Sequence, residues 1–333
     1  MNYSVKLPTI IFLFFLIFYG CSEKETTRIG FLIHDLDKER WENDKNFFVQ
    51  KVSELGGTVD VRIAKNDPEK QLQQAEELLN NGVGVLVIVP VDQFAAAEIV
   101  DKAHTHDVKV ISYDRLIKNC KLDYYVSTDN VEIGKIQAEY LTRIKPKGNY
   151  ALIGGSKTDN NSQFLYLGQM NVLQPLVESG DISVIYNEFT DAWNEKEGYE
   201  HTRKILSLEQ EVDAIIAGND AIALGAVRAL KETGKEKDGL VAGMDADLKN
   251  LHEIIAGHQT CTIYKPYDKL ASTAADLAVK MARYEECDET YQTVSNGAML
   301  VPAVFHDAII VNKENLKLTV ISEGYQTEEE VYR

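Results

Sequence analysis

The sequence has few cysteines, and none of them has the spacing of a metal site. Four cysteines stand among 333 residues, and no two of them form a CxxC pair. We therefore expect no metal site and no cofactor. One disulfide among Cys120, Cys261 and Cys287 is compatible with an oxidising compartment, and the sequence does not select the pair.

The sequence also lacks the motifs of common enzyme classes. It contains no GxSxG, GxGxxG or HExxH, and its GGSK run lacks the spacing of a phosphate-binding P-loop. Asp114 and Asp245 are the carboxylates to consider as a glycosidase pair. Their cationic neighbours should keep both ionised, which leaves no general acid. We therefore expect a protein that is not an enzyme.

Positive charge is scarce relative to negative charge. The chain has 35 Lys and Arg against 52 Asp and Glu, a formal net charge of −17. Lys6 is the only charged side chain of residues 1–21, so removing these residues lowers the net charge from −17 to −18. A field of this sign repels phosphate backbones, so nucleic acid is not an expected partner.

The apolar run at the N-terminus is too short to cross a bilayer as a helix. It extends from Ile10 to Tyr19, follows Lys6, and is followed by a glycine and Cys21. This order is typical of a secretory signal, and a small residue before cysteine resembles a bacterial lipobox, although the residues before the glycine are bulky. We expect a signal peptide over 1–21 with lipid attached to Cys21. A plain signal peptide or an N-terminal anchor is the alternative.

From Arg28 the chain alternates short β-branched runs with amphipathic stretches, a pattern typical of parallel sheets covered by helices. The first cycle predicts strands over 29–33, 59–63, 85–89, 108–112 and 124–127. Helices are predicted near 44–55, before a Gly-Gly stop, and from Pro68, after the capping residue Asp67.

A second cycle begins near Tyr150. It predicts strands over 150–153, 182–186, 214–217, 240–242 and 262–264, and helices over 162–177, 194–206, 220–232 and 248–256. Two five-stranded α/β units imply two lobes with one site in the cleft between them, at the carboxyl ends of the strands. A later helix over 267–284 and a strand near 299–305 indicate several crossovers, which would form a hinge.

Polar and aromatic residues follow these strands, where loops should face the cleft. A neutral polyol there needs both donors and acceptors for its hydroxyls, because a buried unpaired hydroxyl is costly. The two tryptophans of the chain can pack on the C–H faces of a pyranose. We expect the ligand-binding residues to be Arg40, Trp41, Asp114, Arg115, Asn161, Trp193, Asn219, Asp245 and Lys265.

Motifs at these positions resemble the periplasmic xylose-binding proteins of the ABC-transport sugar-binding family. They include ERWENDKNFFVQK, VKVISYDRLI, GNYALIGGSKTDNN, GNDAIALGAVRAL, GMDADL and TIYKP. The resemblance runs from about Arg28 to the C-terminus and assigns the same nine residues to the sugar. It implies a type I periplasmic binding protein, a monomer in the periplasm that captures D-xylose or a similar pyranose for an ABC permease.

The resemblance also implies the domain boundaries. The N-terminal lobe would comprise 27–130 and 266–302, and the C-terminal lobe 131–265 and 303–330. Crossings are expected near Thr128–Val131, Tyr264–Pro266 and Leu300–Pro302.

Other interpretations remain open at this stage. A sensory receptor that presents bound sugar to a membrane kinase or chemoreceptor would have the same site. In the GND motif Asp220 is expected to act only as a helix N-cap. Only one of the paired asparagines needs to reach the ligand, and Asn160 ranks below Asn161. His34 and the other histidines are expected to have surface or structural roles.

Overall fold

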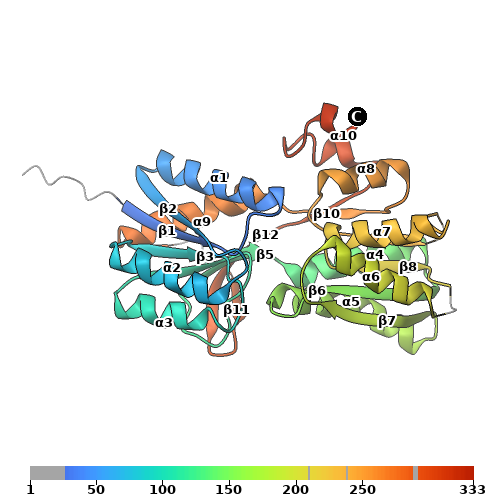
Figure 1. Cartoon of the computed structure of the whole chain (residues 1–333), viewed down its shortest axis with the longest axis horizontal. Helices are drawn as coiled ribbons and strands as arrows, with labels where there is room; N and C mark the ends of the chain where they lie inside the picture. The colour runs from blue at the N-terminus through green and yellow to red at the C-terminus, as the bar shows by residue number, and fades with distance from the viewer. Residues whose placement is uncertain (1–26, 209–210, 238, 288–291) are drawn as a thin grey trace, which may run out of the picture.

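The chain folds into two α/β lobes that lie side by side (Figure 1). The computed structural model describes residues 27–208, 211–237, 239–287 and 292–333. The expected signal peptide and Cys21 lie outside these residues. Within the described part of the chain, no helix is both long and apolar enough to cross a membrane.

A seven-stranded sheet forms the first lobe, in the order β11-β12-β5-β4-β3-β1-β2. All neighbouring strands are parallel except β11 and β12. The strands are β1 (Thr27–Ile33), β2 (Gly57–Ile63), β3 (Val85–Ile88), β4 (Lys109–Tyr113), β5 (Tyr124–Thr128), β11 (Gln292–Ser295) and β12 (Leu300–His306). The helices of this lobe are α1 (Glu39–Glu54), α2 (Pro68–Asn80), α3 (Ala97–Thr105) and α9 (Tyr267–Ala282).

The two faces of this sheet are covered by different helices, which explains its continuous apolar strands. All four residues of β3 are buried, as expected for a central parallel strand. Side chains of α1 and α9 pack on one face, and those of α2 and α3 pack on the other. Helix α2 begins as the sequence predicts, because the Asp67 carboxylate accepts from the N–H groups of Glu69 and Lys70.

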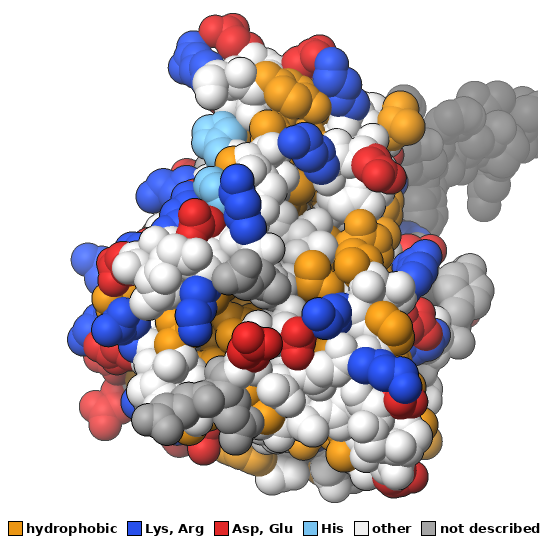
Figure 2. Space-filling model, turned by 90° about the vertical axis from the view of Figure 1, so that its right-hand side faces the viewer, with side chains coloured by type: hydrophobic (Ala, Val, Ile, Leu, Met, Phe, Trp, Pro, Cys, Tyr) orange, Lys and Arg blue, Asp and Glu red, His pale blue; other side chains and the backbone are white. Residues whose placement is uncertain are grey.

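The second lobe contains a four-stranded parallel sheet in the order β7-β6-β8-β9. Its strands are β6 (Gly148–Ser156), β7 (Ile182–Thr190), β8 (Ala214–Ala217) and β9 (Leu240–Ala242). The helices are α4 (Asn130–Ile144), α5 (Asn160–Glu178), α6 (Glu195–Leu206), α7 (Asp220–Glu232), α8 (Leu248–Ala256) and the terminal α10 (Glu328–Val331), with a 3-10 turn, η1 (Leu316–Leu318). Figure 2 shows acidic and basic side chains interspersed over the end of the molecule that this lobe forms.

The expected fifth strand of the second unit does not belong to this sheet. Strand β10 (Thr262–Tyr264) pairs in antiparallel fashion with β13 (Ile309–Val311). It also runs beside the end of β9, with one isolated parallel bridge, Ala242–Cys261, and backbone hydrogen bonds that include the one from the N–H of Asp245 to the carbonyl of Ile263 at 2.8 Å. The fifth strand therefore has the predicted bounds and lies beside β9, but the regular ladder of the second sheet contains four strands and not five. The partner of β10 comes from the chain that returns after the first lobe, and no local pattern indicates this.

The chain passes between the lobes after β5, between β10 and α9, and after β12. Strand β12 stays in the first sheet through His306, which pairs with Thr128. The third crossing therefore follows His306, and the boundary expected near Leu300–Pro302 was too early. The cause is the parallel pairing of β12 with β5, which holds 303–306 in the first lobe.

Two of the cysteines lie in the cores of different lobes. Cys120 is buried with the residues that α2 and α3 cover, whereas Cys261 is buried beside β9. Burial raises the pKa of the Cys120 thiol to about 12. A disulfide between these two residues is incompatible with this separation.

Candidate functional site

All nine residues that the sequence singled out line one cavity between the lobes. The cavity has a volume of about 430 Å³, within the range of small-molecule sites. The first lobe contributes Arg40, Trp41, Asp114 and Arg115, the second contributes Asn161, Trp193, Asn219 and Asp245, and Lys265 lies where the chain crosses between them.

The two carboxylates of this set stand on unusual backbone. Asp114 directly follows β4 with a φ of 61°, and Asp245 follows β9 with a φ of 109°. Both angles fall in the left-handed region that residues with a Cβ rarely adopt. Such strain occurs where the surrounding structure imposes it, often at ligand sites.

A cluster of four charged side chains occupies one side of the cavity. The Arg40 guanidinium contacts the Asp114 carboxylate, and its Nη1 lies 3.5 Å from Asp245 Oδ1. The Lys265 ammonium lies 2.9 Å from Asp245 Oδ1 and 4.0 Å from Asp114 Oδ2. All four side chains are buried in a site that water hardly reaches. Arg40 Nε also lies 3.3 Å from Oδ2 of the buried Asp44, so the two cations pair with three carboxylates.

This pairing controls the ionisation of the carboxylates. Burial opposes the charged form of Asp245, but Lys265 and then Arg40 outweigh it and lower the pKa to about 2. Burial likewise opposes ionisation of Asp114, and Arg40 and Lys265 still hold its pKa below the usual value. Both groups are therefore hydrogen-bond acceptors at neutral pH, as the sequence predicted.

Two aromatic rings fix the Arg40 guanidinium. Its central carbon lies 4.2 Å from the ring centroid of Trp41 and 4.5 Å from that of Tyr267. The Tyr267 hydroxyl also donates to Asp245 Oδ1 at 3.1 Å. Tyr267 was not predicted from the sequence, because it opens a helix of the first lobe and no motif marks its contact with the second.

Trp193 lies flat against the end of β6. A Cβ added to Gly155 would come 2.1 Å from two atoms of the indole ring, so only glycine fits beneath it. The indole nitrogen donates to Asp159 Oδ2 at 3.1 Å. Trp193 also packs against the hydrophobic core of the second lobe and lines the cavity.

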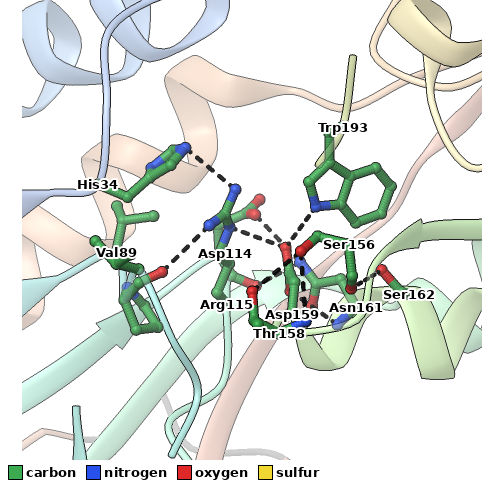
Figure 3. A network of polar contacts seen from close by, with 12 residues as sticks. His34, Val89, Asp114, Arg115, Ser156, Thr158, Asp159, Asn161, Ser162 and Trp193 are labelled. Carbon is green, nitrogen blue, oxygen red and sulfur yellow. Dashed lines mark hydrogen bonds and ion pairs between the residues drawn. The ribbon is translucent and has the colours of Figure 1, made fainter. Parts of the chain in front are cut away.

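His34 is buried in the cavity wall, which excludes the expected surface location and leaves the structural role. Its Nε2 accepts from Arg115 Nη2 at 3.1 Å, and its ring packs edge to face on Trp41 at 4.5 Å (Figure 3). Burial lowers the pKa of His34 well below its usual value, and Arg115 adds to the effect. The imidazole is therefore neutral, and its buried Nδ1 has no partner among the described residues.

The asparagines differ in what they contact. Asn161 lines the cavity and donates to the carbonyl and to Oδ1 of Asp114, both at 3.2 Å, which joins the lobes. Its own Oδ1 is buried without a partner in the described chain. Asn160 is buried and is not among the described residues that line the cavity.

The cap of α7 is Asn219 and not Asp220, which corrects the prediction for the GND motif. Asn219 Oδ1 accepts from the N–H of Ile222 at 3.0 Å. Asp220 is fully buried and accepts from Thr262 Oγ1, Gln259 Nε2 and the N–H of Asp247. Burial, with the nearby Asp247, raises its pKa well above the usual value. Asp220 thus joins α7 to the strands behind the site.

Sequence reasoning missed several residues of the cavity wall. Those with charged or aromatic side chains include His34, Lys38 and Asp159, each inside a strand-end motif whose neighbours were selected. The position of these residues in strand-end motifs indicated that they lie near the cavity. A motif does not show which side chains of a loop point into the cavity. The described residues contain no group of three or more side chains that could hold a metal ion.

Comparison with known proteins agrees with this architecture. The family model of the periplasmic binding protein domain matches residues 29–286. The D-xylose-binding periplasmic protein of Haemophilus influenzae is 39% identical over 95% of this chain and 95% of its own length. The protein of the same name from Escherichia coli is 40% identical over 91% and 92%.

Solved structures of sugar-binding proteins have the same fold as this chain. An ABC transporter solute-binding protein from Clostridium phytofermentans with bound β-D-glucose has a TM-score of 0.84 and 27% identity, covering 91% of this chain and 99% of its own. A carbohydrate transporter solute-binding protein from Chloroflexus aurantiacus with D-glucose has a TM-score of 0.85 and 26% identity, covering 92% and 98%. The chain belongs to the periplasmic binding protein family.

Proposed function

We propose that this protein captures D-xylose, or a closely related pyranose, in the cavity between its lobes and delivers it to an ABC permease. The observation that carries the proposal is the buried cluster of ion-paired side chains formed by Arg40, Asp114, Asp245 and Lys265. It provides charged acceptors and charged donors side by side, as the adjacent hydroxyls of a sugar require. The two relatives named for D-xylose support the choice of sugar.

Further groups around the cavity suit a polyol. Asn161 Oδ1 and His34 Nδ1 are buried polar atoms that have no hydrogen-bond partner among the described residues, so hydroxyl groups of a sugar can satisfy them. Trp193 offers an apolar surface to the C–H groups of the ring. One face of Trp41 is occupied by the Arg40 guanidinium, so this residue supports the charged cluster as well as the wall.

The proposal includes a location and a domain division. The protein would be a monomer held in the periplasm by lipid on Cys21. Its first lobe would comprise 27–130 and 266–306, and its second 131–265 and 307–330, with the end of β12 as the third boundary. Sugar contacts made by both lobes would favour the closed arrangement.

Calorimetric titration with D-xylose, L-arabinose, D-ribose, D-glucose and D-galactose tests the proposed ligand. We expect D-xylose to bind most tightly, and a hexose that binds as tightly would refute the assignment to a pentose. Reconstituted permease separates delivery from sensing, because the sugar-loaded protein should stimulate ATP hydrolysis only in a transport system.

A further inference from the structure

Asp159 is held in place by its own lobe. It is the N-cap of α5, where its Oδ1 accepts from the N–H of Asn161 at 3.0 Å. Its Oδ2 accepts from the indole nitrogen of Trp193 at 3.1 Å. Only 3% of the side chain is exposed when both lobes are in place.

Arg115 approaches the same oxygen from the other lobe. Its Nε lies 2.9 Å from Asp159 Oδ2, while Nη1 donates to the carbonyl of Pro90 at 3.2 Å and Nη2 to His34 Nε2 (Figure 3). The guanidinium is thus oriented by its own lobe and extends one N–H towards the second. Two preformed partners lose little side-chain entropy when they meet.

The contact is part of a seam between the lobes. Beside it, the N–H of Gln93 donates to the carbonyl of Thr158 at 3.1 Å, and Asn161 donates to Asp114. A buried ion pair usually gains little, because each charge must be desolvated. Here two hydrogen bonds within the second lobe already orient the Asp159 carboxylate, so Arg115 meets an acceptor that needs little reordering.

We propose that Asp159 is a positioning residue that links closure of the lobes to the orientation of Trp193. One oxygen, Oδ2, receives both the interlobe cation and the indole N–H, so closing the lobes fixes the aromatic surface on which the sugar ring would rest. This proposal rests on the proposed capture of a sugar between the lobes. In this proposal Asp159 helps to retain the bound sugar, although Asp159 need not contact the sugar itself.

The variant Asp159→Asn isolates this oxygen. Asparagine is as good an N-cap as aspartate, so its carbonyl oxygen can keep the cap on α5. Its amide nitrogen then replaces Oδ2 and accepts from neither Arg115 nor Trp193. Arg115→Gln removes the other partner, and the double variant completes a cycle. The matched control is Glu253→Gln, which breaks the Lys231–Glu253 ion pair within the second lobe.

Stopped-flow release of D-xylose is the first measurement. Because the contact holds the lobes together and breaks when the cavity opens, Asp159→Asn should raise the dissociation rate of D-xylose about tenfold, with a smaller effect on the association rate. Arg115→Gln should have a smaller effect in the Asp159→Asn background than alone. A purely structural role would instead lower the unfolding midpoint and leave the two substitutions additive, and additive effects overturn the proposal.

Small-angle scattering measures the radius of gyration of the protein without sugar, so this second test needs no ligand. Asp159→Asn should increase the radius of gyration, and Glu253→Gln should not. If the wild-type protein binds none of the sugars in the titration panel, the proposed function fails. The scattering measurement then tests the role of Asp159 by itself. An unchanged radius in Asp159→Asn would then overturn the role of Asp159.

Discussion

Arg40 and Asp245 meet at one side of the cavity, with Arg40 Nη1 3.5 Å from Asp245 Oδ1, although they belong to different lobes. Arg40 stands in the first turn of α1, and Asp245 follows β9. Lys265 meets the same Asp245 oxygen from the crossing between β10 and α9. The charged cluster therefore exists only when both lobes and one crossing segment are in place.

Removal of the Asp245 carboxylate should weaken sugar binding. Asp245→Ala deletes a charged acceptor from a buried site, which we expect to cost about 2–4 kcal/mol, or roughly thirty-fold to a thousand-fold in affinity for D-xylose. Calorimetry measures the change, and circular dichroism checks the fold. Asp101→Ala, on the exposed surface of α3, is the matched control and should bind as the wild type does. Unchanged affinity in a folded Asp245→Ala protein would exclude the cavity assignment.

Asp220 should matter for stability far more than a helix cap does. Asp220→Ala leaves the groups of Thr262, Gln259 and Asp247 without their acceptor, and we expect unfolding free energy to fall by about 2–4 kcal/mol. Asp67→Ala, which removes the exposed cap of α2, should cost only about 1 kcal/mol. Urea denaturation of both variants measures the difference. If Asp220→Ala and Asp67→Ala lower the unfolding free energy equally, Asp220 contributes no more than a helix cap.

The low pKa of Asp245 makes its contribution to stability depend on pH. Between the usual value of 3.8 and the folded value of about 2, the unfolded chain binds more protons, so stability falls as pH falls through this window. Above this pH window, the ionised Asp245 carboxylate should contribute about 2 kcal/mol to the free energy of unfolding. The difference in unfolding free energy between wild type and Asp245→Asn should therefore shift by that amount between pH 5 and pH 2. Parallel pH profiles would contradict the assigned pKa.

The proposed lipid attachment would depend on Cys21, a residue outside the described chain. Cys21→Ser should abolish incorporation of a fatty-acid analogue in growing cells and release the protein from the membrane fraction, because serine provides no thiol for the lipid. Cys120→Ser, a change at a buried thiol, should keep the label. Equal labelling of Cys21→Ser and wild type would show that Cys21 is not the anchor.

Local pattern was sufficient for most helices and strands. The predicted bounds of β8, β9, α7 and α8 agree with the structure residue for residue, because buried β-branched runs and amphipathic periodicity are properties of neighbouring residues. The strand-end position of Asp114 and Asp245 followed from the same pattern, since parallel strands deliver their carboxyl ends to one edge. The sequence by itself thus determined two α/β units and the residues that could meet between them.

Tertiary structure decided which distant groups actually meet. The pairing of β10 with β13 and the length of β12 depend on segments that return from the other lobe. The inward turn of His34 and the buried network of Asp220 depend on Arg115 and Thr262, which are far away in the chain. A sequence pattern records what each segment can bury or donate, whereas the partner that satisfies it is fixed only when both lobes pack together.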